Sequence, residues 1–171
     1  MLKDIKIGCA SSNTKYGTRL DSTIIKLEKK AIWSGLFTSN KFKSAPVEIC
    51  LKKINKIISE PKVLMINAGN ANAATGKKGI RDSENLIGEV SSLLSVPKDN
   101  ILPFSTGVVG ELLDTEKLSL AFKKCTAQLG KNSWKDFANA IMTTDTRYKF
   151  VKKEFKLGNQ KINVIGVAKG V

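Results

Sequence analysis

Apolar residues recur at helical spacing in four stretches of the chain, which predicts four amphipathic helices. The first begins at Pro46, where the missing N–H of proline costs no helical hydrogen bond. The third ends at Gly130, a residue that favours helix termination, and the fourth follows a capping box formed by Ser133 and Asp136. The predicted helical stretches are residues 46–58, 86–94, 118–129 and 133–141.

Other segments are rich in β-branched and aromatic residues and are predicted as strands. The continuous apolar run Val63–Ile66 indicates a strand with both faces covered. The last part of the chain predicts a hairpin that turns at Gly158 and Asn159. The predicted strands are residues 22–27, 31–38 and 63–66, a run that starts at 101, and the hairpin strands 148–156 and 162–167. Strands and helices mixed in this order predict an α/β or α+β layered domain.

Length and composition fit one globular domain spanning residues 1–171. The 171 residues are 42% hydrophobic, enough for one buried core, and no apolar run approaches the roughly 20 residues that cross a bilayer. The segment Met1–Lys6 is not followed by the apolar region of a secretory signal. Together with three cysteines, an odd number, this predicts reduced thiols in a cytoplasmic protein without a membrane partner.

The lack of histidine and the high net positive charge restrict the reactions and ligands that the chain can support. The chain has no histidine, so an enzyme built on it must move protons with an amine, a carboxylate or water. Lys and Arg total 29 against 15 Asp and Glu, a net charge of +14 that raises a nucleic-acid or anion-binding hypothesis. The basic residues are scattered and are not interleaved with aromatic side chains as in a base-stacking surface, so we expect no nucleic-acid partner.

The segment Phe104–Gly110 is the most informative for chemistry. It closes the apolar run that starts at Ile101, and Ser105, Thr106 and Gly107 are predicted to form a turn at the end of a strand. Glycine lets a reacting group approach the backbone closely, and fixed N–H and hydroxyl donors suit an oxyanion hole for acyl transfer. The alternative is an ordinary polar turn.

Three other segments carry candidate polar groups. Asn67–Gly79 lacks phosphate-loop spacing and predicts a packed loop in which side-chain amides bond to nearby backbone. Met142–Thr146 closes the fourth helix, either as a cap or as a rim that contacts substrate. Lys169, flanked by small residues at a strand end, is a candidate for holding a substrate carboxylate.

In this order, these motifs resemble one family, the bifunctional glutamate and ornithine N-acetyltransferases of arginine biosynthesis. The resemblance runs from about residue 8 to the end of the chain. The motifs that carry it are Phe37–Asn40 with Ala45–Val47, Asn67–Ala73 with Thr75–Gly76, Ser105–Gly110, Thr143–Asp145 and Ala168–Gly170.

The resemblance implies a layered sandwich with a mixed sheet and helices packed on it, formed by the α part of a self-cleaving precursor. It implies that Thr106 and Gly107 form the oxyanion hole and that Thr143 and Lys169 bind substrate, although Thr144 also fits the motif. The nucleophile would be the N-terminal threonine of a β chain, within an α2β2 heterotetramer. The reaction implied is acetyl transfer from N2-acetyl-L-ornithine to L-glutamate with no cofactor, and acetyl-CoA stays open as a second acetyl donor.

The chain departs from the family pattern at its end. It stops at Val171, where the family usually has Ser or Ala after Lys-Gly and then continues to the cleavage site. We therefore expect an incomplete α chain that lacks the nucleophile and has no transferase activity alone. Two alternatives stay open: a self-cleaving aminopeptidase of similar fold, and a basic anion- or nucleic-acid-binding module.

Overall fold

The computed structural model describes residues 4–28, 31–54 and 62–170. A four-stranded sheet has the strand order β1-β2-β3-β4, with β1 (Ile5–Ala10), β2 (Ser22–Leu27), β3 (Lys62–Asn70) and β4 (Ile101–Val108). The first three strands are antiparallel neighbours, whereas β3 and β4 are parallel. A parallel pair needs a crossover connection, and helix α2 supplies it.

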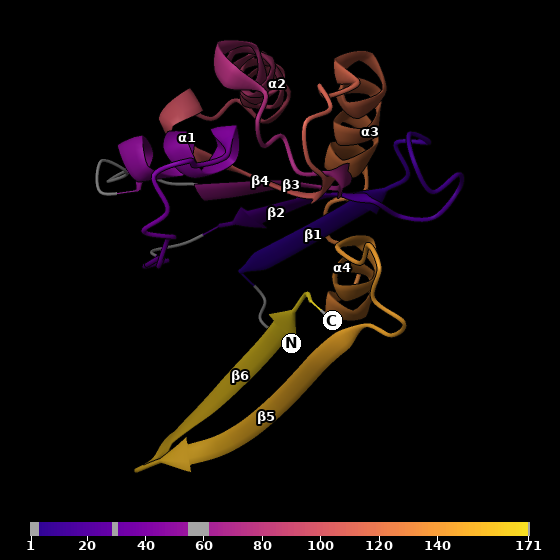
Figure 1. The fold of residues 1–171 in the computed structure, drawn as a ribbon. Helices are drawn as coiled ribbons and strands as arrows, with labels where there is room; N and C mark the ends of the chain where they lie inside the picture. The colour runs from indigo at the N-terminus through magenta and orange to yellow at the C-terminus, as the bar shows by residue number, and fades with distance from the viewer. Residues whose placement is uncertain (1–3, 29–30, 55–61, 171) are drawn as a thin grey trace.

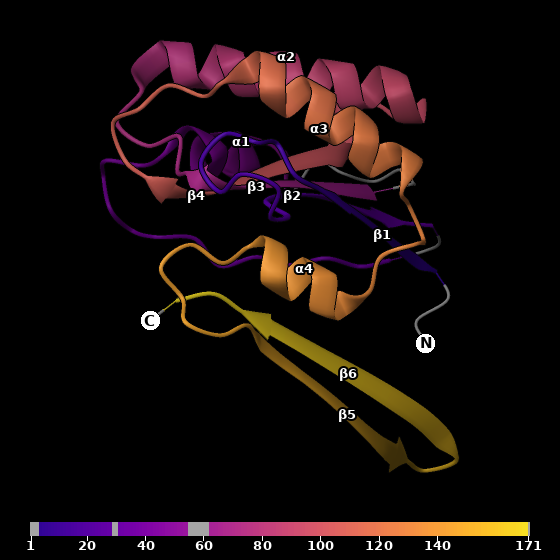
Figure 2. The same ribbon diagram turned by 90° about the vertical axis from the view of Figure 1, so that its right-hand side faces the viewer.

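Within the described residues, four α-helices pack on this sheet. They are α1 (Ala45–Lys53), α2 (Gly76–Leu94), α3 (Thr115–Ala127) and α4 (Trp134–Ala140), and a 3-10 turn, η1 (Lys98–Asn100), leads into β4. Helices α1, α2 and α3 lie on one face of the sheet and α4 lies on the other (Figures 1 and 2). Within the described ranges, none of these helices is long and apolar enough to cross a membrane.

Each face of the sheet contributes to its own core. On the face of α1–α3, Ile24, Val63 and Ile101 pack with helical residues such as Phe122, all of them buried. On the opposite face, Ile7, Ile25 and Ile66 pack with Ala140 of α4. Alternate residues of each strand point to opposite faces, so the apolar runs of β2 and β3 serve both cores.

The chain ends in a two-stranded hairpin that is separate from the main sheet. Strands β5 (Lys149–Leu157) and β6 (Gln160–Ala168) pair in register from Lys149 opposite Ala168 to Leu157 opposite Gln160. The base of the hairpin lies beside α4, and its tip projects away from the rest of the molecule (Figures 1 and 2).

The structure confirms the mixed α/β architecture and corrects several local predictions. Residues 31–38, predicted as a strand, are irregular, and Ile32 and Leu36 are almost fully exposed. Strand β1 was not predicted, yet it forms one edge of the sheet. Helix α2 begins at Gly76, well before the predicted start at Leu86. Residues 55–58 of the first predicted helix lie outside the described residues.

The starts of α1 and α4 agree with their sequence signals, whereas α3 ends at Ala127, before the predicted end at Gly130. Pro46 lies in the first turn of α1, and Ser133 and Asp136 form both hydrogen bonds of the capping box at the start of α4. Cys50 and Cys125 are buried in the core, as expected from the apolar helix faces that carry them.

Candidate functional site

The first candidate pair, Thr106 and Gly107, lies at the carboxyl end of β4. The predicted turn is wrong here, because Ser105, Thr106 and Gly107 are part of the strand and pair with Asn67, Ala68 and Gly69 of β3. Since β4 is the outermost strand of the described sheet on this side, one backbone edge of the pair faces away from β3. Thr106 and Gly107 are both half-buried, so neither is sealed in the core.

Gly107 is required by the neighbouring strand. Its φ is +132°, and a Cβ at this position would lie 2.2 Å from the carbonyl carbon of Gly69 and 2.6 Å from the backbone nitrogen of Asn70. The sequence predicts that a glycine here admits a reacting group to the backbone. The structure shows that it admits the backbone of β3, which holds the Thr106–Gly107 peptide in place.

A network of asparagine side chains fixes the end of β3 against the end of β4. Asn67 Oδ1 accepts a hydrogen bond from Ser105 Oγ at 2.6 Å, and Asn67 Nδ2 donates to the carbonyl oxygen of Asn70 at 2.9 Å. Buried Asn72 donates to the carbonyl oxygen of Gly79 and to Ser83 Oγ. Residues 71–75 are thus the packed, amide-bonded loop that the sequence predicts, whereas residues 67–70 of the predicted loop belong to β3 and residues 76–79 belong to α2.

Backbone hydrogen bonds continue this support beyond the strand. The Ala71 N–H donates to the carbonyl oxygen of Val108, and the Gly110 N–H donates to the carbonyl oxygen of Ala73, each at 2.9 Å. The loop of residues 71–75, which we call the asparagine loop, therefore holds Val108 and Gly110 after Gly107, and Asn67 of β3 holds Ser105 before it. Such rigidity is what a set of preorganised donors requires.

A second cluster surrounds Asp145, which is buried after the end of α4. Its Oδ1 accepts from Lys149 Nζ at 2.7 Å and from the Gly170 N–H at 3.0 Å, and its Oδ2 accepts from the Thr143 N–H at 3.2 Å. Lys149 also donates to the carbonyl oxygen of Gly170. Asp145 therefore joins the loop after α4 to the last described residues of the chain.

The same contacts stabilise the charged form of Asp145. The Lys149 ammonium and then the Gly170 N–H hold the pKa of Asp145 well below its usual range. The sequence suggested a helix cap or a substrate rim for this segment. In the structure the carboxylate bonds to a side-chain ammonium and to N–H groups of the loop and of the chain end.

This cluster brings two predicted site residues together. Thr143 donates its N–H to Asp145, and Lys169 directly precedes Gly170, which is bonded to the same carboxylate. Thr143 is half-buried, whereas Lys169 is exposed and forms no ion pair with residues 4–28, 31–54 or 62–170. Its ammonium is therefore available to a ligand. Asp145 was not among the predicted site residues, although the Thr-Thr-Asp motif contains it.

Thr106 lies on the same side of the sheet as this cluster. It pairs with Ala68, two residues beyond Ile66, whose side chain belongs to the core on the α4 side. Because side chains alternate along a strand, Thr106 points to that side as well. Figure 2 shows the end of β4, the loop after α4 and the C-terminal segment at the same, left-hand end of the molecule.

Arg19 connects the N-terminal loop to the second cluster. Its guanidinium stacks on the Tyr16 ring at 3.7 Å from the ring centroid and donates to the carbonyl oxygen of Met142 at 2.7 Å. The residue next along the chain is Thr143. Sequence reasoning missed Arg19, because nothing in the local pattern indicates a contact across 123 positions.

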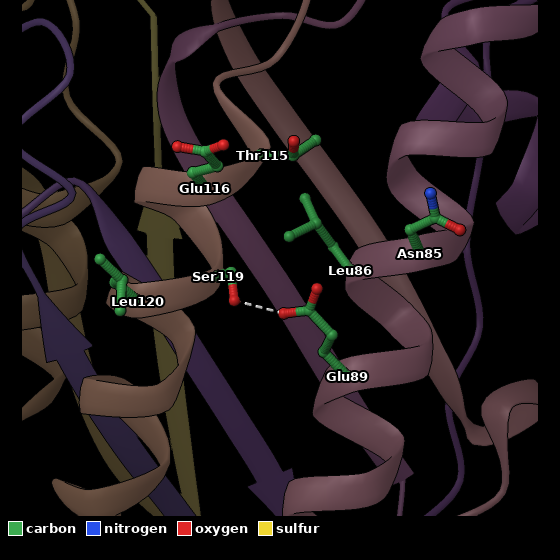
Figure 3. Close-up of a pocket in the computed structure, with 7 residues that line it drawn as sticks. All are labelled: Asn85, Leu86, Glu89, Thr115, Glu116, Ser119 and Leu120. Atoms are coloured by element: carbon green, nitrogen blue, oxygen red, sulfur yellow. Dashed lines mark hydrogen bonds between the residues drawn. The ribbon is translucent and has the colours of Figure 1, made fainter.

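The structure also contains two pockets, of which the second lies beside the asparagine network. One of about 430 Å³ lies between α2 and α3, where Ser119 Oγ donates to Glu89 (Figure 3). Another of about 210 Å³ lies between the end of β3 and the start of α3, and Asn67, Asn70 and Lys15 are among its lining residues. Neither is lined by Thr106, Gly107, Thr143 or Lys169.

The cysteines offer no nucleophile at neutral pH. Burial raises the pKa of Cys9 to about 11 and that of Cys50 to about 12, and it raises the pKa of Cys125 further still. All three are free thiols in the core. In the part of the chain that the structure describes, no group of three or more Cys, Asp or Glu side chains is arranged to hold a metal ion.

Comparison with known proteins decides the family. The model of the ArgJ family matches residues 6–171, nearly the whole chain. The chain belongs to the ArgJ family. This confirms the resemblance found on the sequence motifs.

The relatives are named for arginine biosynthesis. The arginine biosynthesis bifunctional protein ArgJ of Colwellia psychrerythraea is 36% identical over 178 residues, covering 99% of this chain and 42% of its own length. The mitochondrial ArgJ protein of Candida tropicalis is 41% identical over 162 residues, covering 91% of this chain and 40% of its own length. The chain thus spans about two fifths of the curated relatives it matches.

Solved structures of the family share the fold. The ArgJ protein of Bacillus halodurans superimposes with a TM-score of 0.84 at 25% identity, over 99% of this chain and 87% of that one. The ornithine acetyltransferase of Mycobacterium tuberculosis, solved in complex with ornithine, gives a TM-score of 0.83 at 24% identity and covers 99% of this chain. The layered fold is therefore that of ArgJ proteins.

Proposed function

We propose that this chain forms the α part of an acetyltransferase that moves the acetyl group of N2-acetyl-L-ornithine to L-glutamate. The observation that carries the proposal is the placement of Thr106 and Gly107 at the edge of the sheet, held by β3 and the asparagine loop. Membership of a family whose relatives are named for arginine biosynthesis supports this substrate class.

The proposed chemistry needs no histidine. A threonine at the N-terminus of a second, β chain attacks the acetyl carbonyl, and its own α-amine, with an ordinary pKa of about 7.7–8.0, accepts the hydroxyl proton. The carbonyl oxygen gains negative charge, which Thr106 Oγ and the Gly107 N–H stabilise. Ornithine leaves with a proton, and the amine of glutamate then takes the acetyl group from the threonine ester.

The second cluster fits a role in substrate binding. Thr143 and Lys169 flank Asp145 and lie on the same side of the sheet as Thr106. In the proposal the Lys169 ammonium binds the substrate carboxylate, and Thr143 contacts the substrate beside it. Asp145 already accepts three hydrogen bonds, so it positions the two residues instead of binding substrate itself.

The comparison of lengths supports a two-chain enzyme. The chain matches about two fifths of the full-length relatives but 87% of the Bacillus halodurans chain in the solved structure. A precursor divided into two chains accounts for both values. We propose that the nucleophile is contributed by the part of the relatives that this chain does not match.

The test is a two-component assay. This chain is produced together with the part of the Colwellia psychrerythraea ArgJ protein that it does not match, and transfer of labelled acetyl from N-acetylornithine to glutamate is measured. We expect transfer by the pair and none by the 171-residue chain. Thr106→Ala should lower kcat by about 10²–10³ with a small change in KM, because one oxyanion donor is lost.

Thr126→Ala is the matched control. Thr126 is also a half-buried threonine, but it lies on α3 and its hydroxyl donates to the carbonyl oxygen of Lys123. Its kcat should equal that of the unmodified pair. Equal kcat values for Thr106→Ala and Thr126→Ala would remove Thr106 from the mechanism.

A further inference from the structure

The β5–β6 hairpin has two chemically different faces. Because strand residues alternate between faces, Val151, Phe155 and Leu157 of β5 share one face with Ile162 and Val164 of β6. We call these five residues the apolar hairpin face; Lys153, the register partner of Val164, is a charged residue among them. A Cβ on Gly166 would lie 3.0 Å from Val151 Cγ1, so Val151 leans across β6 on this face.

The apolar hairpin face is open to solvent. Val151 is 50% exposed, Phe155 48%, Leu157 67% and Val164 47%. Clustered apolar side chains with this much exposure are uncommon on the surface of a monomeric protein and mark sites where another molecule binds.

Helix α4 covers only the other face, and only near its base. Phe150 and Ile165 lie on that face and line a pocket of about 210 Å³ together with Trp134 of α4. Toward the tip the same face is charged, with an ion pair of 2.7 Å between Lys161 and Glu154. The hairpin is thus amphipathic, with its charged tip surface opposite the apolar hairpin face.

A hairpin of this kind is incomplete as a folding unit. Two strands with a free apolar face are marginally stable in water, and a third strand or a covering layer is needed for independent stability. Each hairpin strand is nine residues long and most of β5 is exposed. The apolar face of β5 therefore needs a covering element, and residues 4–28, 31–54 and 62–170 do not supply one.

The charge of the hairpin restricts that neighbour. Between Lys149 and Ala168 the chain has five lysines and one glutamate. A second copy of the hairpin would bring the same positive charge against it. A polypeptide surface with an apolar centre and an Asp- or Glu-rich rim would instead be attracted.

The position of the hairpin points to one source. The family match continues to residue 171, the relatives are more than twice as long, and the C-terminal residues lie at the base of the hairpin (Figures 1 and 2). We propose that the apolar hairpin face is the docking surface for the part of ArgJ proteins that this chain does not match, through an apolar strand or sheet face with an acidic rim. This inference rests on the proposed function for the existence of that second part.

The experiment measures the affinity of the two parts directly. The 171-residue chain is titrated with the unmatched part of the Colwellia psychrerythraea ArgJ protein, and Kd is obtained by sedimentation or calorimetry. In Phe155→Gln/Val164→Gln we expect Kd to rise at least about tenfold, because an aromatic anchor and its neighbour lose their burial. Amide exchange along β5 and β6 should slow in the unmodified complex.

The matched control is Leu93→Gln/Leu120→Gln. These two leucines are similarly exposed but lie on α2 and α3. The control should bind with unchanged Kd, and thermal unfolding of both double variants should match that of the unmodified chain. Equal Kd for the hairpin and control variants, absence of any complex, or a dimer of this chain that only the hairpin variant dissolves would each overturn the proposal.

The two proposals fail in different ways. A complex that depends on the hairpin but transfers no acetyl group would contradict the acetyltransferase function and leave the docking surface in place. Acetyl transfer that is indifferent to Phe155→Gln/Val164→Gln would contradict the docking surface and leave the function in place.

Discussion

The main sheet and the terminal hairpin both contain strands with several large apolar residues, but β5 also carries five charged residues where β3 carries one, and the two strands are buried to different extents. Strand β3 is buried along almost its whole length because helices cover both faces of the sheet. Strand β5 is exposed along most of its length, although it contains Phe150, Val151, Phe155 and Leu157. The same residue types therefore form a core in one region and an uncovered surface in the other.

The difference shows what burial depends on. An apolar side chain stabilises the fold only when another element removes it from water, at roughly 25 cal/mol per Å². In the main sheet, helices α1–α4 cover the apolar side chains. In the hairpin, α4 covers only the side near the base, where Phe150 and Ile165 lie.

The largest test of this comparison replaces one phenylalanine in each region. Phe122→Ala should lower the free energy of unfolding by about 3–5 kcal/mol, because Phe122 is almost fully buried in the core of α1–α3 and a cavity remains. Phe155→Ala in the same chain should change it by less than about 0.5 kcal/mol, since the ring is half-exposed. Urea unfolding measures both. Similar losses would show that the hairpin is covered in solution.

A glycine in each region gives a second, smaller contrast. Gly107→Ala combines a left-handed φ with a close approach to the Gly69 backbone, so we expect a loss of about 2–4 kcal/mol in the free energy of unfolding. Gly158→Ala, at the hairpin turn, has φ +58° and open space around the new methyl group. It should lose only about 1–2 kcal/mol. Thermal unfolding of the two variants should separate them, and a smaller loss at Gly107 would contradict the tight β3–β4 contact.

The hydrogen bonds of Asp145 connect the loop after α4 to the end of the hairpin. Their loss should change the free energy of unfolding least, and the change should depend on pH. The pKa of Asp145 is lowered in the folded chain, so its contribution to stability is complete above its ordinary value near 4. That contribution is lost as the pH falls from about 4 toward the lowered pKa. The free energy of unfolding should therefore differ between the native chain and Asp145→Asn above pH 4, and less so below it. A difference independent of pH would assign no role to the carboxylate charge.

Local chemistry is enough to predict several elements of this fold. The capping box of Ser133 and Asp136, the proline that opens α1 and the Gly158 turn act over three or four residues, so their outcome does not depend on distant contacts. The candidate residues Thr106, Gly107, Thr143 and Lys169 lie in short sequence motifs, so no tertiary contact is needed to nominate them.

Other features were decided only by tertiary neighbours. Residues 31–38 have the composition of a strand, but β2 is already paired with β1 and β3, and Ile32 and Leu36 remain exposed. The sequence predicts a turn at Ser105–Gly107. In the structure these residues form a strand, because β3 continues beside them to Asn70.

Local residue preferences are enough to predict most helices and the terminal hairpin of this chain, because those preferences come from neighbouring residues. Tertiary structure alone decided that Asp145 joins Thr143 to Gly170, that Arg19 reaches Met142, and that Gly107 must lack a side chain. Each of these depends on backbone segments far apart in the chain meeting at hydrogen-bond or van der Waals distance. No local pattern of residues encodes such a distance.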